Sequence, residues 1–319
     1  MLEWIEKLML PVALASGERP VAELIEAEIA PYVDELRRDP LGNLLCTKKG
    51  TVGDKTILFS AHMDEAGFAV TYVTDGESLD LAAVGEPALD AADGASVTLE
   101  NGTHAVLRKN GDGEVKNARD LHAALSDISG TVCPGDFLAY SHTLKQQDTL
   151  LTGTPLSARV PCAVLIDAAK QLNHPRDNIV FAFTVQGEVG FRGAKAAAFN
   201  SSPDIAVTVG ICPESETLIP GEGIALKLMD GMAVCDRETV LSLEAAAKRA
   251  GISVRYELDK EPSEAFVYQS SGFGAKTAGI SLVCRNPRGT QETLSLRDCE
   301  DASALICAFL EEKKNEYRF

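Results

Sequence analysis

Side chains that could activate water follow two apolar segments of the sequence. His62, Asp64 and Glu65 come after "ILFSA", and Gly187 and Glu188 come after "VFAFTVQ", in front of a glycine-rich turn. Hydrolases often place two adjacent acids at such a position, where one of them serves as the general base. Here the first of the pair would be Gly187. The segment therefore predicts either a working catalytic motif or the remains of one.

Three further candidates lie at or near the ends of apolar segments. Gly210 follows "DIAVTV", Arg288 comes shortly after "ISLVC", and Ser157 lies in "GTPLSARVPCAVL", which leads into a helix. Because ligands of open α/β sheets bind beyond the carboxyl ends of the strands, we expect a pocket here, with Ser157, Cys212 and Arg288 in it. Ser157 lacks the Gly-x-Ser-x-Gly turn of a hydrolase nucleophile. No histidine base matches Cys162 or Cys212, which favours buried structural cysteines over a thiol nucleophile.

The elements that must position these residues alternate along most of the chain. Strand and helix patterns follow one another up to residue 66 and again from residue 153, which predicts an α/β sheet with helices on both faces. Between residues 67 and 152 the pattern changes to short alternating strands with Asp-Gly and Asn-Gly turns, typical of a small β-barrel or sandwich. The predicted organisation is an α/β domain of residues 1–66 and 153–319, with residues 67–152 inserted as a β-rich domain.

Several individual helices are also predicted. Apolar spacing indicates an amphipathic helix at the start of the chain, another over residues 19–36, and a third over residues 162–172. A helix beginning at Arg237 should be closed by Gly251, and a final helix should begin near Leu296.

Composition excludes some classes of function. The formal net charge of −17 argues against partners such as nucleic acid and anionic membranes, whose phosphates require basic patches. Eight cysteines are scattered without a Cys-x-x-Cys pair, which predicts reduced thiols and a cytoplasmic protein. Glu3 and Glu6 stand where a signal peptide would be basic, and no apolar run approaches the ~18 residues of a membrane span.

Five segments, in order, resemble those of the glutamyl, or tetrahedral, aminopeptidases, a family of two-metal exopeptidases of which some members are called endoglucanases. They are "APYVDELRRDPLGNLLCTKKG", "ILFSAHMDEAGFAV", "FTVQGEVGFRGAKAAAF", "ALKLMDG" and "ETLSLRDCEDA". The resemblance covers nearly the whole chain. It implies a mixed sheet with helices on both faces, a small inserted β-barrel used in dimerisation or oligomerisation, and aminopeptidase ancestry.

The resemblance also implies a cage of metal ligands, of which this chain keeps a part. His62 matches the first histidine ligand, Asp64 the acid that orients it, and Glu188 a glutamate ligand. The general base of the family corresponds to Gly187. This glycine cannot activate water, because it has no side chain.

The other three ligand positions have changed chemically. Ser157 stands at the bridging aspartate, Gly210 at a second aspartate, and Arg288 at the last histidine. The histidines are residues 62, 104, 122, 142 and 174, so no shift of alignment can supply a histidine after His174. The resemblance thus implies a divergent member with a degraded metal site.

Arg288 has the largest expected effect on metal binding. Its guanidinium is a permanent cation, and a divalent ion ~4 Å away would be repelled by roughly 8 kcal/mol at an effective dielectric constant of 20. Since the residues matching Glu188 and Arg288 approach the same metal in the family, we expect Arg288 to occupy that position and to pair with Glu188, and with Asp64 if the side chain reaches it. Arg288 as an ordinary surface residue, and Glu188 as an acid favoured at a helix N-terminus, are the alternatives.

Two functions of different class follow. The first is a catalytically silent member without a metal cofactor that acts as a binding or assembly protein. Its partners would be copies of itself, an active relative, or a peptide or small molecule in the pocket. The second is an active metal-dependent aminopeptidase with zinc, cobalt or manganese on rearranged ligands: His62, Asp64, Glu188 and either Cys212 or Glu214. Metal-free chemistry in the same pocket is a third alternative.

Overall fold

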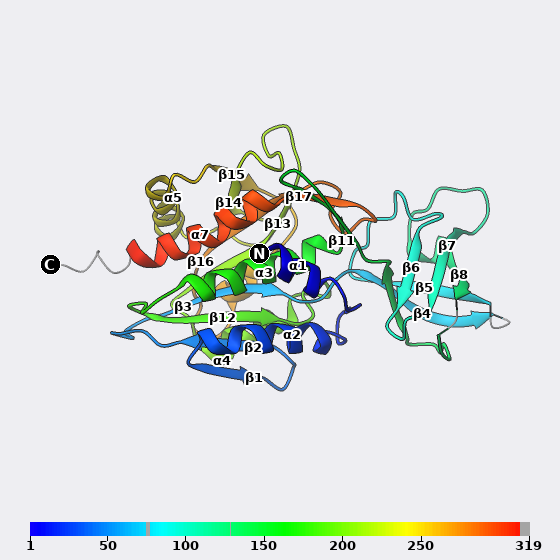
Figure 1. Ribbon diagram of the computed structural model, residues 1–319, viewed down its shortest axis with the longest axis horizontal. Coiled ribbons are helices and arrows are strands. Elements are labelled where there is room, and N and C mark those ends of the chain that lie inside the picture. Colours follow the sequence, from blue (N-terminus) through cyan, green and yellow to red (C-terminus); the bar gives the residue numbers. More distant parts are fainter. Residues whose placement is uncertain (75–76, 128, 313–319) are drawn as a thin grey trace.

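The computed structural model describes residues 1–74, 77–127 and 129–312 (Figure 1). Its larger part is built on an eight-stranded mixed sheet. Four central strands, in the order β12, β3, β13 and β16, are parallel. On one side β2 and then β1 add antiparallel neighbours, and on the other β14 runs antiparallel to β16 while β15 runs parallel to β14. Across the sheet the strands are β1 (Glu35–Arg38), β2 (Leu44–Lys48), β12 (Asn178–Thr184), β3 (Thr56–His62), β13 (Ile205–Pro213), β16 (Lys276–Cys284), β14 (Ile224–Met229) and β15 (Val254–Leu258).

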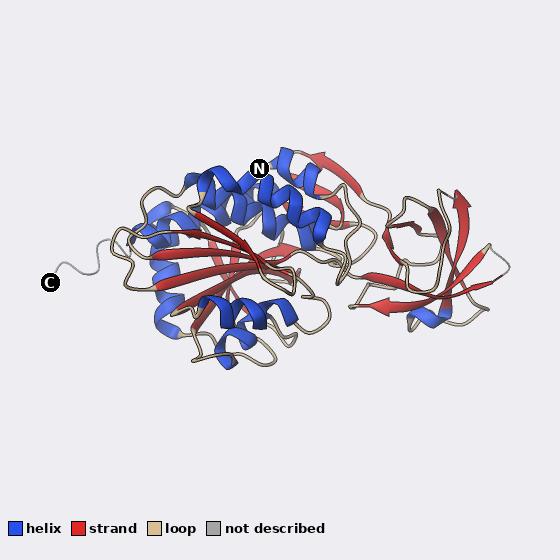
Figure 2. Ribbon diagram, turned by 90° about the horizontal axis from the view of Figure 1, so that it is seen from below, coloured by secondary structure: helices blue, strands red, loops and turns tan. Residues whose placement is uncertain are grey.

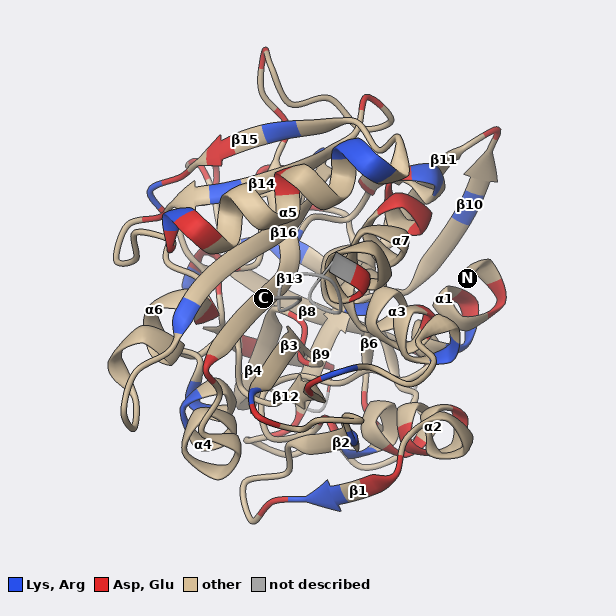
Figure 3. Cartoon of the chain, turned by 90° about the vertical axis from the view of Figure 1, so that its left-hand side faces the viewer, with Lys and Arg blue, Asp and Glu red and all other residues tan. Residues whose placement is uncertain are grey.

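Helices cover both faces of this sheet, as Figure 3 shows in a view along the strands. Alternate residues of the central strands face opposite sides, so that Ile57 and Phe59 enter one core and Leu58 enters the other. One face packs against α1 (Leu2–Leu8), α2 (Arg19–Ile29), α3 (Leu156–Gln171), α5 (Arg237–Ala250) and α7 (Leu296–Glu312), and the other against α4 (Arg192–Ser201) and α6 (Glu264–Ser270). This explains why the central strands are apolar throughout. None of the described helices combines the length and apolar character that crossing a bilayer requires.

The second part of the structure is a closed six-stranded antiparallel barrel, which lies to one side of the α/β part (Figure 2). Phe68, Leu79 and Leu107 belong to its own apolar core. In barrel order the strands are β4 (Gly67–Thr74), β5 (Ser78–Val84), β8 (Leu121–Asp127), β7 (His104–Lys109), β6 (Ser96–Leu99) and β9 (Phe137–Tyr140), with a 3₁₀ turn at Ala118–Asp120. The barrel and the mixed α/β sheet confirm the predicted fold class.

A three-stranded sheet follows the barrel. It consists of β10 (Thr143–Gln147), β11 (Leu150–Thr154) and β17 (Glu292–Ser295), so the chain leaving the barrel pairs with a C-terminal strand. This pairing places the start of α3 beside Glu292.

Two of the predicted helix boundaries were wrong. The helix predicted over 19–36 ends at Ile29, a 3₁₀ turn occupies Ala30–Tyr32, and Glu35–Arg38 forms an edge strand on β2. Ala30 keeps helical backbone angles, but Pro31 has no N–H to continue the i→i−4 hydrogen bonds of the helix, and strand pairing then overrides the apolar spacing of Leu36. The helix predicted from residue 162 begins at Leu156, so Ser157 lies in its first turn. Gly251 closes α5 with a left-handed φ of 72°, as predicted.

Candidate functional site

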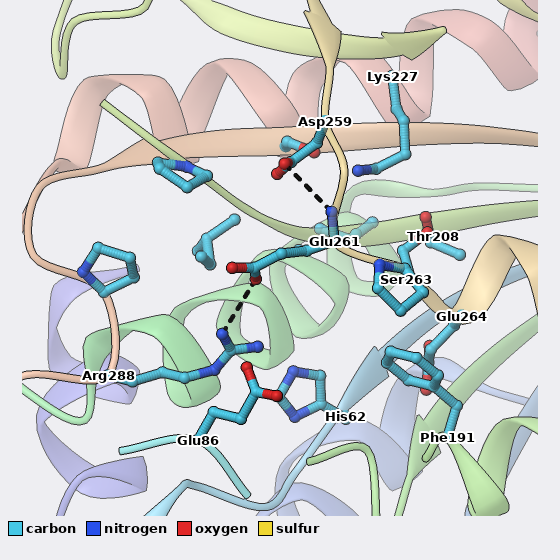
Figure 4. Close-up of a pocket in the computed structure, with 17 residues that line it drawn as sticks. His62, Glu86, Phe191, Thr208, Lys227, Asp259, Glu261, Ser263, Glu264 and Arg288 are labelled. Atoms are coloured by element: carbon cyan, nitrogen blue, oxygen red, sulfur yellow. Dashed lines mark hydrogen bonds and ion pairs between the residues drawn. The ribbon is translucent and has the colours of Figure 1, made fainter. Parts of the chain in front are cut away.

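A cavity of about 270 Å³ lies against the central strands (Figure 4). Charged, hydroxyl and apolar side chains line it together. His62 comes from the end of β3, and Gly210 lies inside β13, three residues before this strand ends at Pro213. The other polar residues in the lining are Glu86, Thr208, Lys227, Asp259, Glu261, Ser263, Glu264, Ser281 and Arg288.

His62 and Asp64 form a hydrogen-bonded unit at the end of β3. Nδ1 of His62 lies 3.0 Å from the backbone oxygen of Asp64 and 3.5 Å from its Oδ1. Asp64 is fully buried and accepts hydrogen bonds from the backbone amides of Gly187 (2.7 Å) and Glu188 (2.9 Å). Burial lowers the pKa of His62, but Asp64, Glu188 and Glu264 more than offset it and raise this pKa to about 9. Asp64 therefore holds both the imidazole and the turn that carries Glu188.

The predicted contact between Arg288 and Glu188 is present. Nε of Arg288 lies 3.1 Å from Oε1 of Glu188, and its Nη1 lies 3.2 Å from Oε2 of Glu261. Glu188 is 6% exposed and Arg288 is 28% exposed, so the pair is largely withdrawn from water. Although burial alone would lower it, the pKa of Arg288 is raised by Glu188 and Glu261. Arg288 is thus not an ordinary surface residue, and Asp64 bonds to His62 and the backbone instead.

The backbone of Arg288 is held as firmly as its side chain. Its φ is 59°, in the left-handed region, and its N–H donates to Oε1 of Glu292 at 2.6 Å. Its carbonyl oxygen accepts a hydrogen bond of 3.0 Å from the backbone N–H of Ala88, which lies in the loop after barrel strand β5. These contacts aim the guanidinium into the cavity.

Ser157 donates both of its hydrogen bonds to the carboxylate of Glu292, a residue that the sequence did not single out. Its N–H donates to Oε2 of Glu292 at 2.7 Å, and its hydroxyl donates to Oε1 at 2.5 Å. Burial raises the pKa of the fully buried Glu292 to about 7. The signal was present in the sequence, since Glu292 opens the segment "ETLSLRDCEDA".

The two substituted glycines differ in the space around them. A Cβ atom at Gly187 would lie only 2.5 Å from Cβ and Cγ of His62, whereas a Cβ at Gly210 would meet nothing within 4 Å. Because real side chains essentially never approach that closely, His62 occupies the place that a side chain at position 187 requires. Gly210 instead leaves open space in the cavity lining.

The two cysteines considered as nucleophiles or ligands, Cys162 and Cys212, lie outside the lining of the cavity. Cys212 is buried in an apolar cluster with Leu218, Ala225 and Val283, outside the lining of the cavity, and its burial raises the pKa of its thiol. Cys162 donates to the backbone oxygen of His62, and burial raises its pKa to about 12. Both groups are therefore protonated and inert at neutral pH.

Glu214 also lies apart from the cavity lining. Its two carboxylate oxygens pair with Arg285 at 2.6 Å at the surface. In the structure it therefore faces a surface arginine rather than His62 or Glu188.

Sequence reasoning did not single out two charged residues of the cavity, although Lys227 lies in the segment "ALKLMDG". Glu264 opens α6 and accepts hydrogen bonds from the hydroxyls of Ser60 (2.6 Å) and Thr184, while burial raises its pKa. Lys227 donates to Glu257 at 2.5 Å. Both are buried, and each is satisfied by a partner that folding brings from another element.

The donor groups in and beside the cavity do not fit a pair of divalent ions that share a bridging carboxylate. Ser157 was predicted to lie in the pocket, but it is not among the residues that line the cavity, because Glu292 holds its hydroxyl and its N–H. Glu188, which also lies outside the lining, binds a guanidinium, and Gly210 offers no side chain. Within residues 1–74, 77–127 and 129–312, no three His, Cys, Asp or Glu side chains form a group that could hold a metal ion. Two such ions require several anionic oxygens and imidazoles in one pocket.

The Arg288–Glu188 pair is expected to stabilise the fold more than a neighbouring surface pair does. Arg288→Ala should lower the free energy of unfolding by about 1–2 kcal/mol, because it leaves a nearly buried carboxylate without its cation. Arg285→Ala is the matched control, since its pair with Glu214 lies at the surface, and it should cost less than about 1 kcal/mol. Urea denaturation of both variants measures the difference, and equal losses would contradict the structural role of the buried pair.

Comparison with known proteins places the chain in a family. The family model of the M42 glutamyl aminopeptidases matches residues 42–110 and 120–305. An aminopeptidase homologue from Acetivibrio thermocellus is 34% identical over 327 residues, which cover 96% of this chain and 97% of the relative.

Solved structures agree. An aminopeptidase of the archaeon Desulfurococcus kamchatkensis superposes with a TM-score of 0.91 at 25% identity, over 97% of this chain and 94% of that one. The TET1 peptidase of Pyrococcus horikoshii, which can assemble into a tetrahedron or a large octahedral shell, gives a TM-score of 0.88 at 26% identity, over 97% and 98%. The chain belongs to the M42 glutamyl aminopeptidase family.

Proposed function

We propose that this chain is an M42-family protein that has lost the two-metal centre, lacks metal-dependent peptidase activity, and acts as a binding or assembly protein. The observation that carries the proposal is the Arg288 guanidinium against Glu188, 3.1 Å away. An ion bound by Glu188 would have to displace this cation or bear its repulsion, roughly 8 kcal/mol at ~4 Å and an effective dielectric constant of 20. His62 and Asp64 alone could not compensate for a loss of that size.

The cavity supports a binding role. Its volume of about 270 Å³ suits a small molecule or the end of a peptide, and its lining mixes charged, hydroxyl and apolar side chains. Figure 4 shows the carboxylate of Glu86 pointing toward His62 and Arg288. Charges of both signs therefore face the cavity, and they favour a small polar ligand.

Assembly is the second part of the proposal. Because a similar structure, the TET1 peptidase, can form closed shells, we propose that this chain also forms a homo-oligomer, alone or with an active relative as a non-catalytic subunit. All eight cysteines are free, which supports the cytoplasm as its location.

An active metal-dependent aminopeptidase with rearranged ligands is the alternative. His62 lines the cavity, and Asp64 still contacts both His62 and the backbone N–H of Glu188. Relatives such as a lysyl aminopeptidase of Pyrococcus furiosus (24% identical) carry the name of the enzyme. In that case zinc or cobalt would be the cofactor. The ion would have to move Arg288 away from Glu188.

Metal analysis of the full chain, purified without chelator, separates the two. We expect less than about half an equivalent of zinc, cobalt and manganese together, because too few donors are free to hold them. Release of N-terminal residues from peptides should be absent with or without added metal. About two equivalents of metal, together with hydrolysis that stops on adding a chelator, would establish the alternative. An active M42 protein treated in parallel is the control for the purification.

A further inference from the structure

The barrel is joined to the α/β domain by two short connections. Residues 63–66 lead from β3 into β4, and Ser141 and His142 lead from β9 to β10. One side chain of each connection contacts the other: Nε2 of His142, whose side chain is 11% exposed, lies 2.8 Å from Oε2 of the buried Glu65. The two connections between the barrel and the α/β domain therefore contact each other directly.

Glu65 links this junction to the α/β domain. Its Oε1 accepts from Nη2 of Arg159 at 2.5 Å and from the backbone N–H of Ala13 at 2.9 Å, and its own N–H donates to the oxygen of Ala13 at 3.0 Å. Burial alone would raise the pKa of Glu65, but Arg159 and His142 hold it below its usual value. The carboxylate of Glu65 thus lies between the side chains of Arg159 and His142.

Arg159 and His142 are satisfied just as fully. Arg159, on α3, has no exposed surface and donates to the backbone oxygens of Leu8 (3.0 Å), Met63 and Pro11 (3.3 Å). Nδ1 of His142 lies 2.7 Å from the backbone oxygen of Met9. Both partners of His142, the carboxylate of Glu65 and the backbone oxygen of Met9, are hydrogen-bond acceptors. The charged groups that face it are Glu65 directly and Arg159 through Glu65, while the segment after α1 presents carbonyl oxygens.

The barrel in turn forms one wall of the cavity. Gly85 packs so closely on Glu188 that a Cβ atom there would lie 2.8 Å from Cβ of Glu188, and Glu86 lines the cavity. Ala88 donates its N–H to the oxygen of Arg288 at 3.0 Å and accepts from the hydroxyl of Tyr140 at 2.6 Å. The position of residues 85–88 therefore depends on how the barrel is seated.

We infer that Arg159, Glu65 and His142 form an interdomain latch, which fixes the barrel on the α/β domain and so holds residues 85–88 against the cavity. If one of these three side chains is removed, the polar groups of the other two lose their partners away from water. The three side chains therefore favour the one arrangement of barrel and α/β domain in which all of them are paired. The latch lies outside the cavity lining, so its action does not depend on whether the cavity binds a metal, a ligand or neither.

Hydrogen exchange of the full chain tests the latch through His142→Ala. We expect the amide of Ala88, which donates to the oxygen of Arg288, to exchange roughly tenfold faster, because the loss of the two hydrogen bonds of His142 lets the barrel move at its junction. Amides inside the barrel, such as that of Leu107, should keep their wild-type rates. His122→Ala, which removes an imidazole that bonds to Asn110 at the barrel surface, is the matched control and should change neither rate.

Unchanged exchange at Ala88 in His142→Ala would overturn the inference, since the histidine would then be local packing only. Faster exchange throughout the barrel would also overturn it, because it would show a loss of barrel stability rather than of seating. If His142→Ala yields no folded protein, exchange is measured in His142→Gln and judged by the same outcomes, because glutamine keeps most of the volume but cannot place donors at both ring-nitrogen positions.

Discussion

Restoring three ligand positions together, by Ser157→Asp, Gly210→Asp and Arg288→His, should raise the affinity for zinc by at least about 10³-fold. The largest contribution comes from Arg288, because its removal eliminates a repulsion of roughly 8 kcal/mol, of which about 4 kcal/mol already corresponds to 10³. Removal of the guanidinium also frees Glu188, from which it lies 3.1 Å away. Two added carboxylates and an imidazole then supply donors of the kind that zinc prefers.

The structure indicates how each replacement will fit. An aspartate at position 210 extends into open space, since a Cβ there meets nothing within 4 Å. An aspartate at position 157 faces Glu292, whose carboxylate now accepts both hydrogen bonds of Ser157. Two carboxylates in direct contact, at positions 157 and 292, share a proton as long as no cation is bound. Zinc binding should therefore release a proton.

Calorimetric titration in the presence of a competing chelator measures this affinity. The matched control carries Ser157→Asn, Gly210→Asn and Arg288→Gln, which reproduce the shapes without the charges or the imidazole, and it should bind no more zinc than the wild type does. Equal gains in both triple variants, or no gain in either, would show that these positions do not surround one metal site.

Gly187 is expected to resist even the smallest side chain. Gly187→Ala should lower the free energy of unfolding by about 2–3 kcal/mol, because its methyl group would lie 2.5 Å from two atoms of His62 and force the ring to move. Gly210→Ala, the matched control on the neighbouring cavity wall, should be neutral or slightly stabilising, since the new methyl group is unobstructed and the unfolded chain loses freedom. Urea unfolding curves for both variants test the difference.

This prediction has a consequence for restoring the general base. A glutamate at position 187 shares the obstructed Cβ, so it can act on water only if His62 moves away from its contact with Asp64, now 3.0 Å. Similar losses in the two alanine variants would show that His62 yields easily and that the base could be restored without rearrangement.

Much of the fold could be predicted from local patterns. The apolar run that ends at His62, the turn chemistry of the barrel and the glycine that closes α5 each depend on neighbouring residues, and all three were recognised. The predictions that failed concern residues whose structure depends on contacts with distant parts of the chain. Residues 35–38 have helical spacing but form a strand because β2 lies beside them, and the cavity excludes Cys212 because an apolar cluster encloses it.

The sequence by itself determined which chemical groups stand at the positions that resemble the family's site, because Ser157, Gly187, Gly210 and Arg288 carry their chemistry wherever they lie. Only the tertiary structure decided which other side chains these groups contact. Arg288 lies against a carboxylate 100 positions away, and Ser157 against one 135 positions away. Such contacts depend on how strands, helices and a barrel pack together, and no local spacing encodes the distances between them.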